Sequence, residues 1–147
     1  MGSPPKMSSK VTLGSPAQTS GSTLQWVVED TASKTVIAAC LLFQYDAGSA
    51  RAELGYVLGR AHWRQGLARE AITAVCDRAF GALGIRRIEA EVHPDNAASN
   101  NLLQRIGFVH EGRARQRWVA KGATYDTQLY GCLASEWQPG IGGTVAA

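Results

Sequence analysis

A strand followed closely by a glycine-bearing turn and an amphipathic helix is the feature that most constrains this chain. The run 51–58 predicts a strand, and Gly66 and Ala68 open a helix with apolar residues at the helical period. Backbone N–H groups at a helix N-terminus converge and carry partial positive charge. Gly66 and Ala68 have no bulky side chains, so a ligand can approach the backbone closely there. The succession of strand, turn and helix therefore favours a binding site for a pyrophosphate. A turn that merely starts a helix fits the same residues.

A second strand, helix and glycine follow along the chain. Residues 87–92 predict a strand, Pro94 breaks regular structure, and Asp95 or Asn96 can cap a helix that ends at Gly107. Strand, helix and strand in succession imply a right-handed crossover. The sheet is therefore expected to contain a parallel strand pair.

The other elements are predicted from the same periodicities. The expected elements are strands at 24–30, 35–45, 109–119 and 125–133, the last two joined as a hairpin, and a first helix at 66–83 with Gly84 as its C-cap. The almost continuously apolar run 35–45 is expected to be a central strand covered on both faces.

Three segments are expected along the chain. Residues 1–23, rich in Ser, Gly, Thr and Pro, predict a flexible lead-in in which only 11–13 adds a short strand. Residues 24–137 form the domain, and 138–147 are expected to be a disordered tail.

Composition narrows the function classes. A chain of 147 residues with a net charge of +3 suits one domain, and this charge fits an anionic cofactor as well as nucleic acid. Cys40, Cys76 and Cys132 lie far apart in apolar runs, which predicts buried thiols and neither disulfides nor a metal site. No apolar run suits a membrane span and no signal peptide is visible, so a cytoplasmic protein is predicted.

The stretches 55–71 and 87–108 together resemble the GNAT superfamily of acetyl-CoA-dependent N-acetyltransferases, and within it the RimJ/RimL-like branch that acetylates ribosomal-protein N-termini. The superfamily signature Q/R-x-x-G-x-G/A corresponds to 63–68, where Trp63 departs from the general first residue but looks like the usual choice in that branch. The end of the chain at 126–133 looks like the D-x-x-L-Y ending of the same branch.

The resemblance covers roughly residues 25–133 and implies an α+β fold. That fold is a mixed, mostly antiparallel sheet with a V-shaped opening, flanked by two main helices. The family ordinarily begins with a strand and two helices, which residues 1–23 cannot supply. The N-terminal helices, which usually wall one side of the acceptor site, are therefore expected to be missing.

The resemblance also implies acetyl-CoA as co-substrate and direct acetyl transfer to a primary amine. The backbone of the strand would hold the pantetheine arm, with an amide there polarising the thioester. Asn96 and Ser99 match positions that meet the cofactor, and Asn96 could equally be only a helix cap. The residues implied for the cofactor are Tyr56, Val57, Leu58, Trp63, Arg64, Gln65, Gly66, Leu67, Ala68, Asn96 and Ser99.

Glu53 is the candidate general base by resemblance, acting through water on the acceptor ammonium, although a solvated strand glutamate fits equally. Glu89 and Glu91 share one face of their strand. One of them could be a second carboxylate at the site, but solvent or arginine partners are favoured. Leu103 stands where many superfamily members carry a general-acid tyrosine. Ser99 or water would have to protonate the leaving thiolate, or the thiolate leaves unassisted.

Several alternatives stay open. The acceptor could be an N-terminal peptide, a polyamine, an antibiotic or a free amino acid. A catalytically weak acetyl-CoA-binding module or a dimeric interaction protein is the second interpretation, and a homodimer would cover the apolar side left by the missing helices.

The arginines of the hairpin have their own alternatives. By the two-residue period, one exposed face of the hairpin is expected to carry Arg113, Arg115 and Arg117. Such a face is usually solvated, but it could contact an acidic acceptor or RNA. Nucleic-acid binding is not favoured. Trp118 is interpreted as a core or interface residue.

Overall fold

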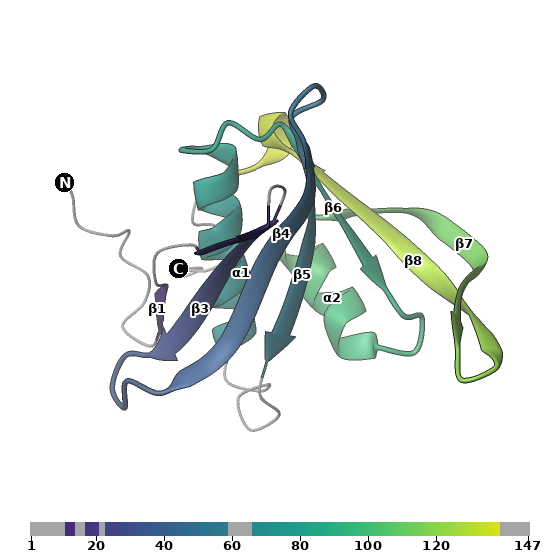
Figure 1. Ribbon diagram of the computed structural model, residues 1–147, viewed down its shortest axis with the longest axis horizontal. Helices are drawn as coiled ribbons and strands as arrows, with labels where there is room; N and C mark the ends of the chain where they lie inside the picture. The colour runs from purple at the N-terminus through teal and green to yellow at the C-terminus, as the bar shows by residue number, and fades with distance from the viewer. Residues whose placement is uncertain (1–10, 14–16, 21–22, 59–65, 139–147) are drawn as a thin grey trace.

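One twisted sheet with two helices makes up the computed structural model of the protein (Figure 1), which describes residues 11–13, 17–20, 23–58 and 66–138. The strands run in the order β1-β3-β4-β5-β6-β8-β7, and β2 also pairs with β3. The elements are β1 (Val11–Leu13), β2 (Ala17–Ser20), β3 (Thr23–Asp30), β4 (Val36–Asp46), β5 (Arg51–Leu58), α1 (Leu67–Phe80), β6 (Arg87–Val92), α2 (Ala97–Ile106), β7 (Val109–Ala120), β8 (Ala123–Leu133) and the 3-10 turn η2 (Ala134–Glu136).

The sheet is mixed and mostly antiparallel, as predicted. Among the strands that the structure describes, only β5 and β6 pair in parallel, joined by the α1 crossover, whereas the other strand pairs are antiparallel. A parallel pair needs such a long connection because the chain must return to the same end of the sheet.

The edge of the sheet beside β3 differs from the prediction. The strand at Val11–Leu13 is confirmed, but β2 at Ala17–Ser20 was not predicted. Both pair antiparallel with β3, β1 beside Val28–Asp30 and β2 beside Thr23–Gln25, so they follow one edge. Within the described residues no helix precedes β3, as the short lead-in implied.

Both helices contribute to a single core on one face of the sheet. Alternate residues of β4, β5 and β6 are buried, as their two-residue side-chain period requires. Trp26 from β3 and Leu103 from α2 are fully buried in the same cluster as Ile72 and Val75 from α1. The three cysteines are buried and free, as expected for small apolar residues of this core.

Helix α1 ends earlier than its apolar period predicts. The predicted end at Leu83 is wrong: the helix stops at Phe80, and the Gly81 N–H donates to Asp77 O at 2.9 Å. Glycine favours leaving a helix because its backbone loses the most freedom there. The chain then turns so that Ile85, and not Leu83, enters the core, with exposed fractions of 4% and 38%.

Strand β4 lies in the middle of the sheet, but it is not covered on both faces as predicted. Ala38, Cys40 and Leu42 are buried on the helix side, whereas Leu41 and Phe43 are only half-buried on the other. The second face stays partly open because both helices pack on the first.

No helix in the described part of the chain is long and apolar enough to cross a membrane. The same residues contain no cluster of three or more His, Cys, Asp or Glu side chains suited to a metal ion.

Leu103→Ala should lower the free energy of unfolding by about 2–5 kcal/mol, because the change opens a cavity in a fully buried position. The matched control is Leu83→Ala, which should cost about 1 kcal/mol or less since that side chain is 38% exposed. Urea-induced unfolding followed by circular dichroism measures both. Equal losses would contradict this description of the core.

Candidate active site

Strands β5 and β6 separate part of the way along their length. They pair only from Arg51–Arg87 to Glu53–Glu89. Beyond that point β5 stays paired with β4, and β6 stays paired with β8. In Figure 1 the β6, β8 and β7 strands diverge from β3, β4 and β5, and α2 lies behind the opening. The V-shaped opening implied by the resemblance is therefore present, with Glu53 at its vertex.

The backbone edge of β5 beyond Glu53 has no strand partner on the side of β6 within the part of the chain that the structure describes. A strand edge of this kind offers N–H and C=O groups to a ligand. Val57 is 68% exposed beside this edge, and Tyr56 directs its half-buried side chain to the helix face. The Leu58 backbone belongs to β5, but its side chain lies outside the described residues.

The start of α2 lies next to Tyr56. Asn96 caps the helix, since its Oδ1 accepts the Ser99 N–H at 3.1 Å. Ser99 is 4% exposed and is adjacent to the Tyr56 hydroxyl, which makes no hydrogen bond of good geometry within the described residues. Burial raises the pKa of Tyr56, and the Ser99 side chain opposes that shift.

The start of α1 is the second part of the predicted cofactor site. Gly66 has a left-handed backbone with φ of 73° and provides no side-chain cap, and a Cβ there would meet nothing within 4 Å. The first N–H groups of a helix have no partner within the helix. Leu67 and Ala68 are buried against the core. The remaining predicted residues, Trp63, Arg64 and Gln65, lie outside the described residues.

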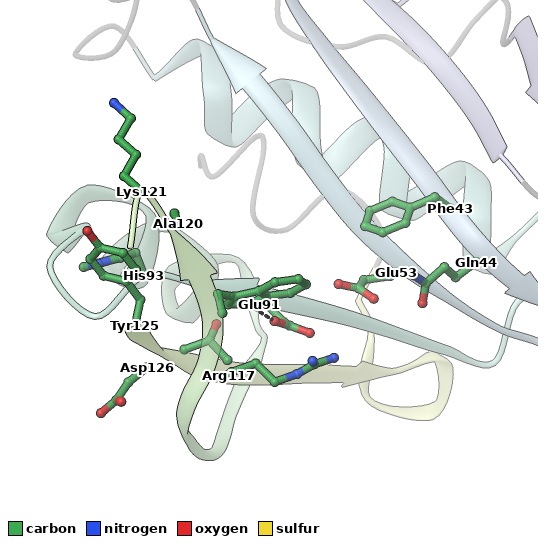
Figure 2. Close-up of a pocket in the computed structure, with 12 residues that line it drawn as sticks. Phe43, Gln44, Glu53, Glu91, His93, Arg117, Ala120, Lys121, Tyr125 and Asp126 are labelled. Atoms are coloured by element: carbon green, nitrogen blue, oxygen red, sulfur yellow. Dashed lines mark hydrogen bonds between the residues drawn. The ribbon is translucent and has the colours of Figure 1, made fainter. Parts of the chain in front are cut away.

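A pocket of about 650 Å³ lies beside the vertex of the opening, on the sheet face away from the helices (Figure 2). It extends from β4 and β5 across β6 to the β7–β8 hairpin. Its lining residues are Phe43, Gln44, Glu53, Glu91, His93, Arg117, Trp118, Ala120, Lys121, Tyr125, Asp126 and Thr127.

Three carboxylates line this pocket, and two of them, Glu53 and Glu91, form no ion pair among the described residues. Burial raises the pKa of Glu53, and the negative charges of Glu91 and Glu89 raise it further, whereas Arg117 and Arg51 act in the opposite direction. A carboxylate in this environment can hold or release a proton closer to neutral pH than an exposed one.

Glu91 is held in place by Trp118. The indole Nε1–H donates to Glu91 Oε1 at 3.0 Å, and the Trp118 side chain is half exposed. Trp118 is therefore not a core residue, and its alternative as an interface residue stays a prediction. The hydrogen bond leaves the charge of Glu91 uncompensated, because the indole is a neutral donor.

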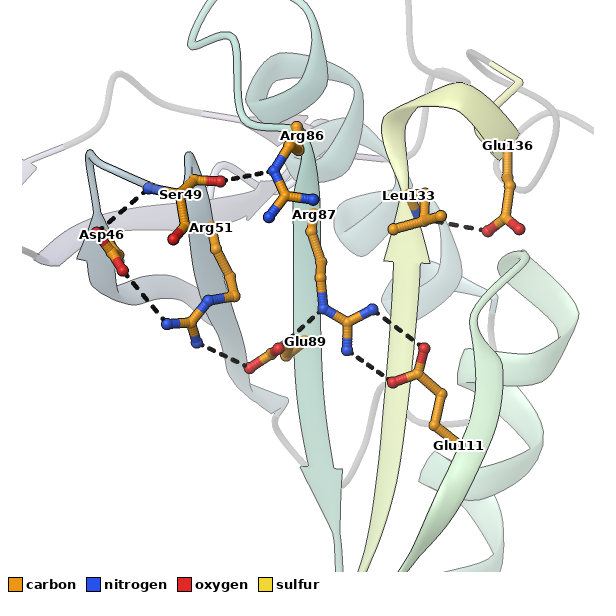
Figure 3. Close-up of polar contacts among 9 residues, drawn as sticks. All are labelled: Asp46, Ser49, Arg51, Arg86, Arg87, Glu89, Glu111, Leu133 and Glu136. Carbon is orange, nitrogen blue, oxygen red and sulfur yellow. Dashed lines mark hydrogen bonds and ion pairs between the residues drawn. The ribbon is translucent and has the colours of Figure 1, made fainter.

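Glu89 has a different role from Glu91, although both lie on one face of β6. It accepts from Arg51 at 3.3 Å and from Arg87 at 2.9 Å, and Arg87 also pairs with Glu111 at 2.6 Å (Figure 3). The favoured interpretation, arginine partners, is thus confirmed for Glu89. Glu91 is the residue that fits the other alternative, a second carboxylate in the pocket.

A β-bulge in β7 changes the direction of the hairpin arginines. The register with β8 shifts between Ala114 and Trp118, and Gln116 has a φ of 51°. Asp126 holds the bulge by accepting from the Gln116 N–H at 2.8 Å and from Arg113 Nε at 2.9 Å. Bulges reorient side chains in this way.

The three arginines are exposed, as expected, but the expectation that they share one face is wrong. Arg113 contacts Asp126, whereas Arg117 lines the pocket and lies over the Trp118 ring at 4.7 Å from its centroid. Sequence reasoning missed Arg117 and Trp118 as pocket residues because it assumed an unbroken two-residue period.

Comparison with known proteins identifies the class to which this fold and opening belong. The sequence matches the family described as "Acetyltransferase (GNAT) domain" over residues 6–109. The protein therefore belongs to the GNAT acetyltransferase family.

Individual relatives agree with this assignment. The [Ribosomal protein uS5]-alanine N-acetyltransferase of Escherichia coli is 32% identical over 121 residues, which are 82% of this chain and 62% of the relative. Among solved structures, Mycobacterium smegmatis RimJ in complex with CoA-disulfide has a TM-score of 0.74 at 28% identity, covering 79% of this chain and 55% of that chain.

A chimera of the spermidine N-acetyltransferase SpeG from Vibrio cholerae and hSSAT also has a TM-score of 0.74, at 27% identity, covering 78% of this chain and 69% of that one.

The uS5-alanine acetyltransferase and RimJ matches confirm the resemblance to the RimJ branch. The names of these relatives differ in the acceptor that they give. The chain spans about three fifths of the length of the curated relatives it matches.

Glu91→Gln should lower the pKa of Glu53, because it removes the negative charge with the larger of two raising effects on that pKa. Arg117→Met should shift the same pKa upward, since the arginine lowers it. Carboxyl-carbon NMR titration of Glu53 measures both shifts. Shifts of the same sign in the two variants would contradict the arrangement of charges in the pocket.

Proposed function

We propose that this protein is an acetyl-CoA-dependent N-acetyltransferase that moves an acetyl group directly to a primary amine. The observation that carries the proposal is the parting of β5 and β6 at Glu53, beside a pocket lined by the Glu53 and Glu91 carboxylates. Membership of the GNAT family and the RimJ-like relatives support the same function.

The residues of the opening fit acetyl-CoA. The unpaired edge of β5 from Tyr56 to Leu58 would take the pantetheine arm as an additional strand. The uncapped start of α1, from Gly66 to Ala68, would receive the pyrophosphate together with Trp63, Arg64 and Gln65. Asn96 and Ser99 would contact the arm from the start of α2. Acetyl-CoA supplies an activated thioester carbonyl.

Glu53 would accept a proton from the acceptor ammonium, directly or through one water, so that the neutral amine can attack. The nitrogen then forms a bond to the carbonyl carbon while the carbon–sulfur bond breaks. Backbone N–H groups of β5 would stabilise the developing oxyanion. Glu53 would pass this first proton to solvent and then take the second proton, which the nitrogen loses as the amide forms, and the sulfur leaves as a thiolate.

The leaving thiolate would find a proton donor near the opening although position 103 is a leucine. The Tyr56 hydroxyl and Ser99 lie together at the opening, so we assign them to the protonation of the leaving sulfur. A covalent acyl-enzyme is not part of the proposal, because burial raises the pKa of Cys40, opposite Tyr56, to about 12.

A catalytically weak acetyl-CoA-binding module is the second candidate. The buried Leu103 favours it, since leucine replaces the usual tyrosine and cannot donate a proton. Both candidates bind acetyl-CoA, and only the first releases free thiol when an amine is added. A cytoplasmic location and a homodimer remain predictions, and light scattering of the purified protein tests the latter.

Gly66→Asp should weaken CoA binding by about tenfold or more, because it places a negative charge where the pyrophosphate would lie. The left-handed backbone of Gly66, with φ of 73°, also strains any side chain placed there, so the control must carry the same strain. The matched control is Gly84→Asp, since Gly84 also has a positive φ, 66°, and open space around its Cβ. Titration calorimetry measures both, and equal effects would contradict the assignment of the phosphate site.

Glu53→Gln should lower kcat/KM by about 100- to 10,000-fold, the usual contribution of a general base. The loss should be larger for a lysine-type amine, with a pKa of about 10.4, than for an α-amine at about 7.7–8.0. Thiol release with Nα-acetyl-lysinamide and alaninamide measures the two losses. Glu29→Gln, on β3, is the control, and a loss of similar size there would argue against a specific role for Glu53.

A further inference from the structure

The charged groups that line the pocket are of both signs. Arg117 and Lys121 line it together with Glu53 and Glu91. Neither cation forms an ion pair with another described residue. The third carboxylate of the lining, Asp126, is already engaged by Arg113 and by the bulge backbone. Two carboxylates, Glu53 and Glu91, and two cations therefore line the pocket without a close ion pair among the described residues.

Arg117 is the cation that faces the carboxylates. In Figure 2 its guanidinium points to the same part of the pocket as the Glu53 and Glu91 carboxylates, whereas Lys121 points away from them. The Arg117 guanidinium lies 4.7 Å from the Trp118 ring centroid, and the same indole donates to Glu91 at 3.0 Å. Trp118 therefore fixes one acidic and one basic group on the same wall.

The position of Arg117 in the pocket depends on the β-bulge in β7. Without the register shift between Ala114 and Trp118, Arg117 would follow the two-residue period of Arg113 and Arg115. Asp126 holds the shift through two hydrogen bonds of 2.8 and 2.9 Å. A guanidinium held in this position suits a planar carboxylate, which it can bind through two parallel hydrogen bonds.

These charges discriminate between classes of acceptor. A polyamine would bring a second positive charge towards Arg117, and a simple amine would leave this guanidinium without a counter-ion. Only an acceptor with both signs of charge complements both sides of the pocket.

Building on the proposed transfer activity, we propose that the acceptor is a primary amine that also bears a carboxylate. Its ammonium would lie at Glu53 and Glu91, and its carboxylate would bind Arg117. A free amino acid and a peptide with an acidic residue next to its N-terminus both have this chemistry.

The test compares acids with their amides. Thiol release from acetyl-CoA is measured with alanine and alaninamide, β-alanine and β-alaninamide, and the dipeptides alanyl-glutamate amide and alanyl-glutamine amide, with spermidine as the polyamine. Because the amine basicity differs within a pair, the quantity that matters is the acid-to-amide ratio of kcat/KM compared between protein variants. The free amino acids and the dipeptides distinguish the two sources of the carboxylate.

Arg117→Met should lower this ratio about tenfold or more for at least one pair, because a charge-assisted hydrogen bond is lost. Arg117→Lys should retain part of the preference. The matched control Arg115→Met should keep the wild-type ratio, since Arg115 does not line the pocket. Thermal unfolding of each variant verifies that the hairpin remains folded.

The outcomes separate this inference from the proposed function. An unchanged ratio in Arg117→Met, or a wild-type protein that prefers spermidine, would overturn the inference while leaving acetyl transfer established. No turnover with any amine would instead contradict the proposed function. Calorimetric titration of the same pairs into the CoA complex then tests the inference alone, and the absence of a carboxylate preference there would overturn it.

Discussion

The rest of this structure depends on the loss of hydrogen bonding between β5 and β6 beyond Glu53 and Glu89. Beyond this point β5 stays hydrogen-bonded to β4, and β6 stays hydrogen-bonded to β8. Both halves of the sheet therefore keep their strand pairing on either side of the opening. An opened sheet leaves backbone donors and acceptors unpaired, and such groups need a partner. A ligand that pairs as a strand meets this requirement, which explains why the opening, the start of α2 and the pocket belong together.

Charge in the pocket is organised by the β7–β8 hairpin more than by the sheet. Glu53 and Glu91 come from neighbouring strands, and their negative charges repel each other when both are ionised. This repulsion contributes to the raised pKa of Glu53. Trp118 holds Glu91 with a neutral donor, and Arg117 supplies the opposing charge from the bulge. The hairpin can therefore change the acceptor preference without altering the sheet that would bind the cofactor.

Much of the architecture could be predicted from the sequence because it follows from periodicity. The bounds of β5 and β6, the cap at Asn96 and the parallel pair follow from local patterns. Strand β2 was missed because its polar Ala-Gln-Thr-Ser sequence carries no apolar alternation, and it pairs through the backbone along the edge of β3.

The site was only partly predictable for a related reason. Glu53, Tyr56 and Ser99 were found by resemblance to a family motif, and the structure brings them to one opening. Arg117 lines the pocket because of a bulge between Ala114 and Trp118, which a two-residue period cannot predict. The central claim is tested most directly by hydrogen–deuterium exchange with and without acetyl-CoA. Protection of the β5 amides after Glu53 and of the start of α2, without change along β1 and β3, is expected; binding that leaves the β5 amides unprotected would contradict the account.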